Sequence, residues 1–348
     1  MIVPATPFLA VDLEVLDANI ERTAAWSADR GIALRPHVKT HKCPEIALRQ
    51  RDAGGSGMTV ATIGEAEVFA QAGFDDLFIA YPLWIDEERH ARLRRVSEWA
   101  VVTVGIDSAE GARRLVGSGV SALVEVDSGH HRTGVDPREA GELAAAAVAV
   151  GLPVVGVFAF PGHSYAPGGR EEAAHSEADA LLRAATSLRD AGVEPHVVSG
   201  GSSPSLAATG VGLSEVRPGV YVVNDAQQWE LGACSTEQIA LSCHATVVSH
   251  AGGRLILDAG SKVLGADRPL WASGSGRLLD EPQARILSLS EHHAVVDMRG
   301  GPLPGLGTVV RVVPNHACNA INLVDELFVV ADGTVVDAWP VTARGLNA

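Results

Sequence analysis

Basic and nucleophilic side chains crowd into one short segment near the start of the sequence. Two lysines, two histidines and an arginine occur within the eight residues "RPHVKTHK". The apolar alternation of residues 33–39 predicts a strand that ends at Lys39, and its two-residue period places Arg35, His37 and Lys39 on one face. A lysine directed inward beside other cations has a lowered pKa, which favours a Schiff base with an aldehyde. A solvated lysine at a strand end is the ordinary alternative.

A second pair of reactive groups occurs in "NHAC", residues 315–318. His316 and Cys318 are separated by one residue, so on a strand both side chains would leave the same face. Imidazole and thiolate are typical zinc ligands. Two ligands are fewer than a structural zinc site needs, so this spacing alone is also compatible with an incidental pair.

The elements that must position Lys39 alternate between short apolar strands and helices, which is the pattern of βαβ units around a parallel sheet. We expect eight strands, at residues 33–39, 57–62, 76–81, 101–106, 121–127, 154–160, 195–200 and 216–223. The helices expected between them lie at residues 43–54, 64–74, 86–100, 108–119, 136–151 and 171–191. This order predicts a (β/α)8 barrel, a TIM-like fold whose active site lies at the carboxyl ends of the strands. A doubly wound sheet shows the same alternation and is the alternative.

The texture of the sequence changes after residue 235. Alternating strands and hairpin turns such as "ADGT" and "HAGGR" predict an antiparallel β domain. We therefore expect an N-terminal segment at residues 1–20 that joins the β domain, a barrel at residues 21–235 and a C-terminal β domain at residues 236–348. The last of these contains the His316–Cys318 pair.

A glycine- and serine-rich segment, "SGGSSPS" at residues 199–205, follows the seventh expected strand. In α/β barrels the loops after strands seven and eight commonly bind a phosphate through backbone N–H groups. On its own such a segment is more often a turn. Together with an inward lysine on the first strand, it predicts a phosphorylated aldehyde cofactor, pyridoxal 5'-phosphate, with Lys39 as its covalent partner.

Composition excludes several classes of partner. The formal net charge of -15 and the lack of a basic run argue against nucleic acid and anionic membranes. The N-terminus lacks the pattern of a signal peptide, and no segment reaches the ~18 consecutive apolar residues that mark a membrane span. Four irregularly spaced cysteines indicate reduced thiols and a cytoplasmic protein.

Six motifs, in order along nearly the whole chain, resemble those of the D-threonine aldolase and D-serine dehydratase family. They are "RPHVKTHK", "EVDSGHHRTGV", "FPGHSY", "VVSGGSSPS", "EVRPGVYVVND" and "VPNHACNAINL". Members of this family are pyridoxal-phosphate enzymes with the alanine-racemase type of fold, also called fold type III. The resemblance implies a barrel that binds the cofactor and a β domain that carries a metal site.

The resemblance assigns roles to individual residues. Lys39 would hold the cofactor covalently, Lys42 would be a surface neighbour, and Arg132 would hydrogen-bond the phenolic oxygen of the cofactor. The residues matching the phosphate cradle, together with Ser199 beside them, are Gly200, Gly201, Ser202, Gly219, Val220 and Tyr221. His163 and Tyr165 would lie against the ring or the substrate, and His37 would line the site as a catalytic candidate. Arg217 would meet the pyridine nitrogen, or equally form a salt bridge within the barrel.

The resemblance also implies that His316 and Cys318 bind a divalent metal, zinc or manganese, with open positions for water and substrate. A cysteine at this position is similar to the zinc-dependent D-serine dehydratases, whereas D-threonine aldolases carry an aspartate there and favour manganese. The softer thiolate shifts the preference toward zinc.

The expected activity is cleavage of a D-3-hydroxy amino acid, with two reactions open. A D-threonine aldolase breaks the Cα–Cβ bond and yields glycine and an aldehyde. A D-serine dehydratase eliminates the hydroxyl and yields a keto acid and ammonia. We favour the aldolase. A racemase of this fold usually takes its second base from a tyrosine on the β domain, whereas all three tyrosines here lie in the barrel region, so racemisation is disfavoured. A non-catalytic carrier is disfavoured because it would lack the β domain. Related enzymes are homodimers, in which His316 and Cys318 complete either their own site or the partner's.

Overall fold

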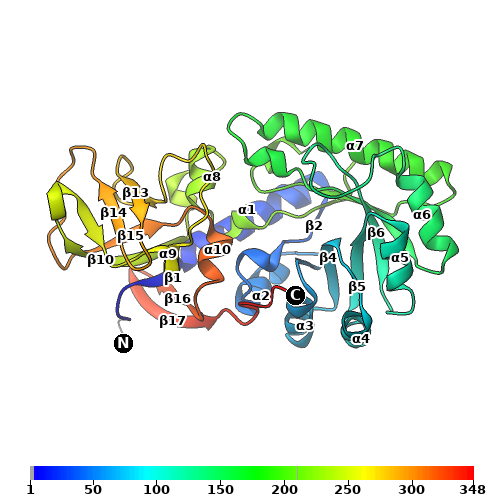
Figure 1. Cartoon of the computed structure of the whole chain (residues 1–348), viewed down its shortest axis with the longest axis horizontal. Helices are drawn as coiled ribbons and strands as arrows, with labels where there is room; N and C mark the ends of the chain where they lie inside the picture. Colours follow the sequence, from blue (N-terminus) through cyan, green and yellow to red (C-terminus); the bar gives the residue numbers. More distant parts are fainter. Residues whose placement is uncertain (1–3, 210) are drawn as a thin grey trace. The chain divides into compact units, whose positions relative to one another are not determined.

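The computed structural model describes residues 4–209 and 211–348, which form two compact units (Figure 1). The first unit comprises the described residues up to Arg22, then Thr40–Ile46 and Val220–Gly345. The second comprises Thr23–Lys39, Ala47–Gly219 and Leu346–Ala348. No helix within the described ranges combines the length and apolar character needed to span a membrane. The four cysteines are all free thiols.

The second unit is built on eight parallel strands, as the alternation of elements predicts. They are β2 (Ala33–Leu34), β3 (Met58–Val60), β4 (Asp76–Pro82), β5 (Val101–Ile106), β6 (Ser121–Glu125), β7 (Val154–Phe158), β8 (Val197–Gly200) and β9 (Glu215–Val216). Their order is β2-β9-β8-β7-β6-β5-β4-β3. The segment after β2 joins β3 through a parallel bridge between His37 and Thr59, and the Thr59 N–H donates to the Pro36 carbonyl at 2.8 Å. These contacts close the sheet into a barrel, and the doubly wound alternative is excluded.

Helices follow the strands of this unit (Figure 1). They are α3 (Ile63–Gln71), α4 (Glu87–Val96), α5 (Ala109–Leu115), α6 (Ala140–Ala149) and α7 (Arg170–Asp190), while α1 (Leu13–Arg30) and α2 (Pro44–Asp52) each contribute residues to both units. Side chains of Thr62, Asp86 and Ser108 accept hydrogen bonds from the first-turn amides of α3, α4 and α5. Such caps fix where each helix begins after its strand.

The barrel interior contains a cluster of apolar side chains from three of its strands, β4, β6 and β7. Phe78 on β4, Leu123 on β6 and Phe158 on β7 form one buried cluster, with the two phenylalanine rings edge to face at 5.0 Å. Gly105 on β5 leaves room for this cluster, because a Cβ there would lie 2.7 Å from the Phe158 ring. The barrel is therefore a packed core with its chemistry confined to one end.

Two expected strands end earlier than the sequence predicts. The prediction that the first strand reaches Lys39 is wrong: β2 ends at Leu34, and Lys39 lies in a short 3₁₀ helix, η1 (Val38–Thr40). The last barrel strand ends at Val216, and Val220–Val222 forms the 3₁₀ helix η4. Pro36 and Pro218 each lie two residues after the last residue of these strands. Because proline lacks a backbone N–H, it cannot donate to the next bond of a ladder.

Arg35 also departs from the predicted shared face with Lys39. Its guanidinium donates to Asp76 at 2.8 Å and to Glu215 at 2.6 Å. Asp76 and Glu215 begin β4 and β9, so Arg35 lies at the amino-terminal end of the barrel, opposite the end that carries the chemistry. Burial lowers the pKa of Arg35, but the two carboxylates outweigh it and hold the pKa above its ordinary value.

The first unit contains a mostly antiparallel nine-stranded sheet, as expected. Its strands are β1 (Phe8–Asp12), β10 (Leu241–Ser249), β11 (Leu255–Leu257), β12 (Arg277–Leu278), β13 (Arg285–Leu289), β14 (Ala294–Asp297), β15 (Val309–Val313), β16 (Glu326–Ala331) and β17 (Thr334–Pro340). The N-terminal strand β1 pairs antiparallel with β10 and parallel with β16. Short helices α8 (Ala226–Glu230), α9 (Ser261–Leu264) and α10 (Ala317–Ile321) accompany this sheet.

Candidate functional site

The aromatic ring of Phe160, just past the end of β7, collects several of the predicted site residues. The ammonium of Lys39 lies 5.6 Å from its centroid and the guanidinium of Arg132 lies 5.3 Å from it. The rings of His130 and Tyr165 lie at 5.7 Å and 6.3 Å. A cation over an aromatic face is attracted by the ring quadrupole. Phe160 therefore gathers an amine and a guanidinium at the carboxyl end of the barrel, where barrel enzymes place their chemistry.

The loop that carries Arg132 is held by hydrogen bonds to the end of β6. The Thr133 hydroxyl donates to Glu125 Oε1 at 2.7 Å, and the His131 N–H donates to Asp127 at 3.0 Å. Burial raises the pKa of Glu125, partly offset by Thr133 and by the charge of Arg132. The residues on either side of Arg132 are therefore both hydrogen-bonded to the end of β6, which fixes the loop that carries it.

Two histidines lie beside this cluster. His163, in the 3₁₀ helix η2 (Gly162–Tyr165), pairs through Nε2 with the Ser176 hydroxyl at 3.0 Å. Its Nδ1 is buried and has no hydrogen-bond partner within residues 4–209 and 211–348. Burial lowers the pKa of both His163 and His130, and the charge of Arg132 lowers that of His130 further. Both rings are therefore neutral at physiological pH and able to exchange a proton with a ligand. His37 lies in the barrel-closing segment, where its N–H donates to the Pro218 carbonyl at 3.0 Å.

The glycine- and serine-rich loop after β8 differs in detail from a row of open amides. The Gly201 N–H donates to both carboxylate oxygens of Glu177, at 3.0 and 2.9 Å, and the Ser202 N–H donates to the Ser205 hydroxyl at 3.1 Å. The hydroxyls of Ser164, Ser202 and Ser205 form a buried chain with 2.8 Å between neighbours. These hydroxyls, rather than the two engaged amides, are the groups that a phosphate would find here.

Glu177 was not predicted from the sequence. It lies on α7, is 1% exposed, and approaches so closely that a Cβ on Gly200 would lie 2.8 Å from its Oε1. Burial raises its pKa to about 8, against the opposing effects of the Gly201 N–H and the charge of Arg217. Glu177 therefore shapes the loop from behind.

Arg217 lies inside the barrel and has a set of partners there. Its guanidinium lies 5.5 Å from the Phe78 ring and 5.3 Å from the Phe158 ring. It donates to the Ser199 hydroxyl and to the Ala159 carbonyl. Burial lowers its pKa, while nearby glutamates oppose this effect. These contacts favour a supporting role in the barrel over a contact with the pyridine nitrogen.

The remaining cradle residues lie where the chain changes unit. Gly219 is the last residue of its segment in the second unit, and Val220 begins the following segment in the first. Val220 and Tyr221 are buried in η4, and the Asn224 N–H donates to the Val220 carbonyl at 2.7 Å.

The predicted metal pair lies in the first unit, but on a different element from the one expected. The prediction that His316 and Cys318 share a strand is wrong: His316 is the N-cap of α10 and Cys318 belongs to its first turn. The helix begins here because the Ala317 N–H donates to Asp225 at 3.0 Å. Since an N-cap residue is extended, the two side chains still adjoin.

The surroundings of this pair are polar and partly buried. His316 Nδ1 lies 2.6 Å from Asp267 Oδ2, and Cys318 Sγ lies 3.5 Å from the Thr40 hydroxyl. Burial lowers the pKa of His316, but the Cys318 thiolate and Asp267 outweigh it and raise the pKa to about 11. Burial also raises the pKa of Asp225, to about 6. No cluster of three or more His, Cys, Asp or Glu side chains suited to a metal ion occurs in the described ranges.

Lys42 departs from its expected place at the surface. It is 6% exposed, has a left-handed backbone with φ of 52°, and donates to Asn322 Oδ1 at 2.9 Å. Asn322 is the C-cap of α10. The prediction of a surface lysine is therefore wrong, and Lys42 instead anchors the helix that carries Cys318.

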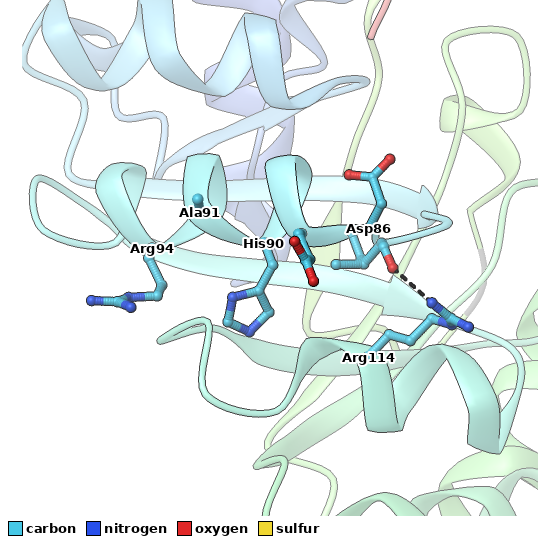
Figure 2. A pocket seen from close by; sticks show the side chains of 7 residues that line it. Asp86, His90, Ala91, Arg94 and Arg114 are labelled. Atoms are coloured by element: carbon cyan, nitrogen blue, oxygen red, sulfur yellow. Dashed lines mark hydrogen bonds between the residues drawn. The ribbon is translucent and has the colours of Figure 1, made fainter.

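A pocket of about 440 Å³ on the second unit lies apart from these residues (Figure 2). It is lined by Ile85, Asp86, Glu87, His90, Ala91, Arg94 and Arg114. Several of its polar groups have partners in the fold, since His90 pairs with the Val116 carbonyl at 3.0 Å and Arg114 donates to the Ile85 carbonyl at 3.1 Å. No predicted site residue is among those that line it.

Three residues that contact the predicted site residues were not predicted from the sequence. Phe160 begins the motif "FPGHSY", but it also ends an expected apolar strand, and nothing in the sequence distinguishes it from a core residue of that strand. Glu177 and Asp267 are each an ordinary acidic residue in the sequence, and their partners lie 24 and 49 positions away. No local pattern marks either one.

Comparison with known proteins agrees with the motifs. Residues 11–227 match the family model described as the alanine racemase N-terminal domain, and residues 240–330 match a domain family named for serine dehydratase. D-threonine aldolase from Arthrobacter sp. is 36% identical over 363 residues, which cover 98% of this chain and 93% of the relative. D-threo-3-hydroxyaspartate dehydratase from Delftia sp. is 33% identical over 346 residues, which cover 90% of each chain.

Solved structures show the same likeness. A cysteine-to-alanine variant of D-threo-3-hydroxyaspartate dehydratase, in a metal-free form, superposes with a TM-score of 0.89 at 30% identity over 97% of both chains. A second variant of a D-threo-3-hydroxyaspartate dehydratase, in which a histidine two positions earlier is replaced by alanine, gives a TM-score of 0.89 at 30% identity over 97% of this chain and 95% of that one. The chain therefore belongs to the family of alanine-racemase-type fold that contains D-threonine aldolase and D-threo-3-hydroxyaspartate dehydratase, as its motifs predict.

Proposed function

We propose that this protein is a pyridoxal-phosphate-dependent lyase that cleaves D-3-hydroxy amino acids in the manner of a D-threonine aldolase. The observation that carries the proposal is the convergence of Lys39 and Arg132 on the Phe160 ring, at the end of the barrel where the family's motifs meet. Membership of an alanine-racemase-type family implies the same cofactor. The named relatives are aldolases and a dehydratase that act on D-amino acids.

The residues present fit pyridoxal phosphate. Lys39 supplies a primary amine able to attach to an aldehyde, and Arg132 supplies a cation for a phenolic oxygen. The chain of serine hydroxyls after β8, with Ser202 at its centre, supplies donors for a phosphate. When bound, the cofactor acts as an electron sink for the bond that is broken.

Within this arrangement the protein's own groups have separate tasks. Lys39 would hold the cofactor in place, and its amine would also be the group able to accept or return a proton there. The Arg132 guanidinium lies beside Phe160 and favours an anion there. His163 in η2, neutral and with a buried Nδ1 that has no partner within the described residues, is positioned as a proton carrier.

We also propose that His316 and Cys318 bind a divalent metal, with zinc favoured by the thiolate and manganese as the other candidate. An imidazole and a thiol at the start of α10 are a suitable donor pair, and two protein ligands leave positions open for water and for the substrate hydroxyl. The dehydratase variants add support, because the histidine and cysteine replaced there have the same spacing as His316 and Cys318.

Dehydration is the second candidate reaction. One specific observation favours it: a dehydratase relative has a histidine and a cysteine separated by one residue, the same spacing as His316 and Cys318. Incubation with D-threonine and D-serine decides between the two reactions. Glycine and acetaldehyde identify the aldolase, pyruvate or 2-oxobutanoate with ammonia identifies the dehydratase, and neither set of products would overturn the proposed function.

The cofactor and metal are tested separately. The purified protein should show the absorption band of bound pyridoxal phosphate, and EDTA should abolish turnover until zinc or manganese is added back. Full activity after exhaustive chelation would remove the role given to His316 and Cys318. We further propose a homodimer, which light scattering of the purified protein would test.

A further inference from the structure

Asp267 contacts His316 from a segment of the chain that lies outside all six motifs. Its Oδ2 lies 2.6 Å from Nδ1 of the imidazole, although 49 positions separate the two residues in the sequence. Both side chains are about one-third exposed, at 36% for Asp267 and 34% for His316. The contact therefore lies at a partly open site, accessible to a small ligand.

This contact decides which ring nitrogen of His316 is available. An imidazole that donates Nδ1–H to a carboxylate presents Nε2 as its metal-binding atom, with the ring orientation fixed. Cys318 also interacts with the His316 side chain, and so does the charge of Asp225. Asp267 therefore engages one ring nitrogen while the thiol lies within reach of the same side chain.

The backbone of the pair is held as well. Asp225 is 1% exposed and accepts from the Ala317 N–H, which fixes the start of α10 between His316 and Cys318. The segment of Asp267 approaches α10 closely at Gly265, where φ is +79° and a Cβ would lie 3.4 Å from the Asn319 Cβ. Asp267 is therefore brought to His316 by a defined backbone path.

We propose that Asp267 is a positioning residue that orients His316 for a divalent metal shared with Cys318. The inference rests on the metal site of the proposed function and adds a residue that does not itself bind the metal. Carboxylates that receive the outer N–H of a metal-bound histidine typically contribute 10–100-fold to metal affinity.

The test uses metal binding, measured without substrate or turnover. Chelated, cofactor-loaded protein is titrated with Co²⁺, whose thiolate charge-transfer absorption reports Cys318 as a ligand, and Zn²⁺ affinity follows from competition. Asp267→Ala is expected to weaken binding about 10–100-fold. Asp267→Asn can still accept from Nδ1–H and is expected to weaken it less. The control is Asp280→Ala, which removes an exposed carboxylate of the same unit that pairs with Arg311.

Each outcome has a distinct meaning. Stoichiometric Co²⁺ binding by the wild type that is lost in His316→Ala establishes the metal site. Absence of binding by the wild type overturns the metal site and the role of Asp267 together. Binding by Asp267→Ala within about twofold of the wild type overturns the role of Asp267 alone. If Asp267→Ala does not fold, as judged by circular dichroism, Asp267→Leu, which has a similar size and no acceptor, replaces it, and binding within about twofold of the wild type has that same meaning.

Discussion

Replacing Phe160 by leucine tests whether its ring organises the cofactor site. The substitution keeps an apolar side chain but removes the face over which Lys39 and Arg132 lie, at 5.6 and 5.3 Å from the centroid. Each cation–aromatic contact at a partly exposed site is worth ~0.5–1 kcal/mol, so both together contribute ~1–2 kcal/mol. Without the ring, Lys39 and Arg132 are no longer held in place before the cofactor binds, and fixing them then costs binding free energy. We therefore expect the dissociation constant of pyridoxal phosphate to rise by up to about 5–30-fold, since 1.4 kcal/mol corresponds to a factor of ten.

The assay is titration of cofactor-free protein, followed by absorption and by quenching of tryptophan fluorescence. The matched control is Trp26→Leu, because Trp26 is also a partly buried aromatic residue under a guanidinium, with Arg30 at 4.6 Å from its ring. Trp26 lies on α1, outside the predicted site, so this variant should bind the cofactor as the wild type does. An unchanged dissociation constant for Phe160→Leu, with the control also unchanged, would refute the organising role of the ring.

Further predictions concern the covalent lysine, the barrel interior and the buried carboxylate. Borohydride reduction of the loaded protein should fix the cofactor on the peptide that contains Lys39; mass-spectrometric labelling of Lys42 instead would contradict the assignment. Arg217→Met removes the buried donor of the Ser199 hydroxyl and the Ala159 carbonyl, and because a buried polar group left without its partner costs ~1–3 kcal/mol, a urea midpoint equal to that of the wild type would contradict the supporting role of Arg217. The folded protein keeps a proton on Glu177 up to about pH 8, whereas an unfolded glutamate loses it near its ordinary pKa of 4.5. Stability contributed by this group is therefore complete below pH 4.5 and falls as pH rises toward 8, by at most about 1.4 kcal/mol per pH unit. Glu177→Gln should flatten that part of the urea-unfolding profile, and an unaltered slope would count against the buried protonated acid.

Local patterns were sufficient to predict the barrel. The eight strands were recognisable because each is a short apolar run followed by a helical segment, and β5 occupies the residues expected for it, Val101–Ile106. The errors fall where the chain has an extended sequence but a proline interrupts the ladder, as after β2 and β9. The two-residue period of apolar side chains is the same whether or not a proline is present, so it does not reveal that the strand has lost a backbone N–H donor.

The predicted site was accessible to sequence reasoning where chemistry is carried by distinctive residue types. Lys39 and Arg132 stand out in motifs, and the structure brings both to one ring. The supporting residues do not stand out, because a glutamate on α7 or an aspartate between α9 and β12 looks like any solvated acid until the fold buries it or places a partner beside it. The division of the chain into two units was also not predictable from local patterns, because Thr40–Ile46 belongs to the same unit as Val220–Gly345.

The histidine–cysteine pair shows how a wrong element can leave the right neighbours together. On a strand, His316 and Cys318 would share a face by the two-residue period; at the start of α10 they adjoin because the extended N-cap residue is followed by the first helical turn. The start of a helix also provides a backbone N–H, that of Ala317, for a side chain to bind. Asp225 fixes the backbone between the two residues by accepting from the Ala317 N–H, and Asp267 holds the His316 ring at Nδ1. A fixed backbone and a fixed imidazole hold the two donor groups of a common two-residue spacing in place, which is what the metal site proposed for them requires.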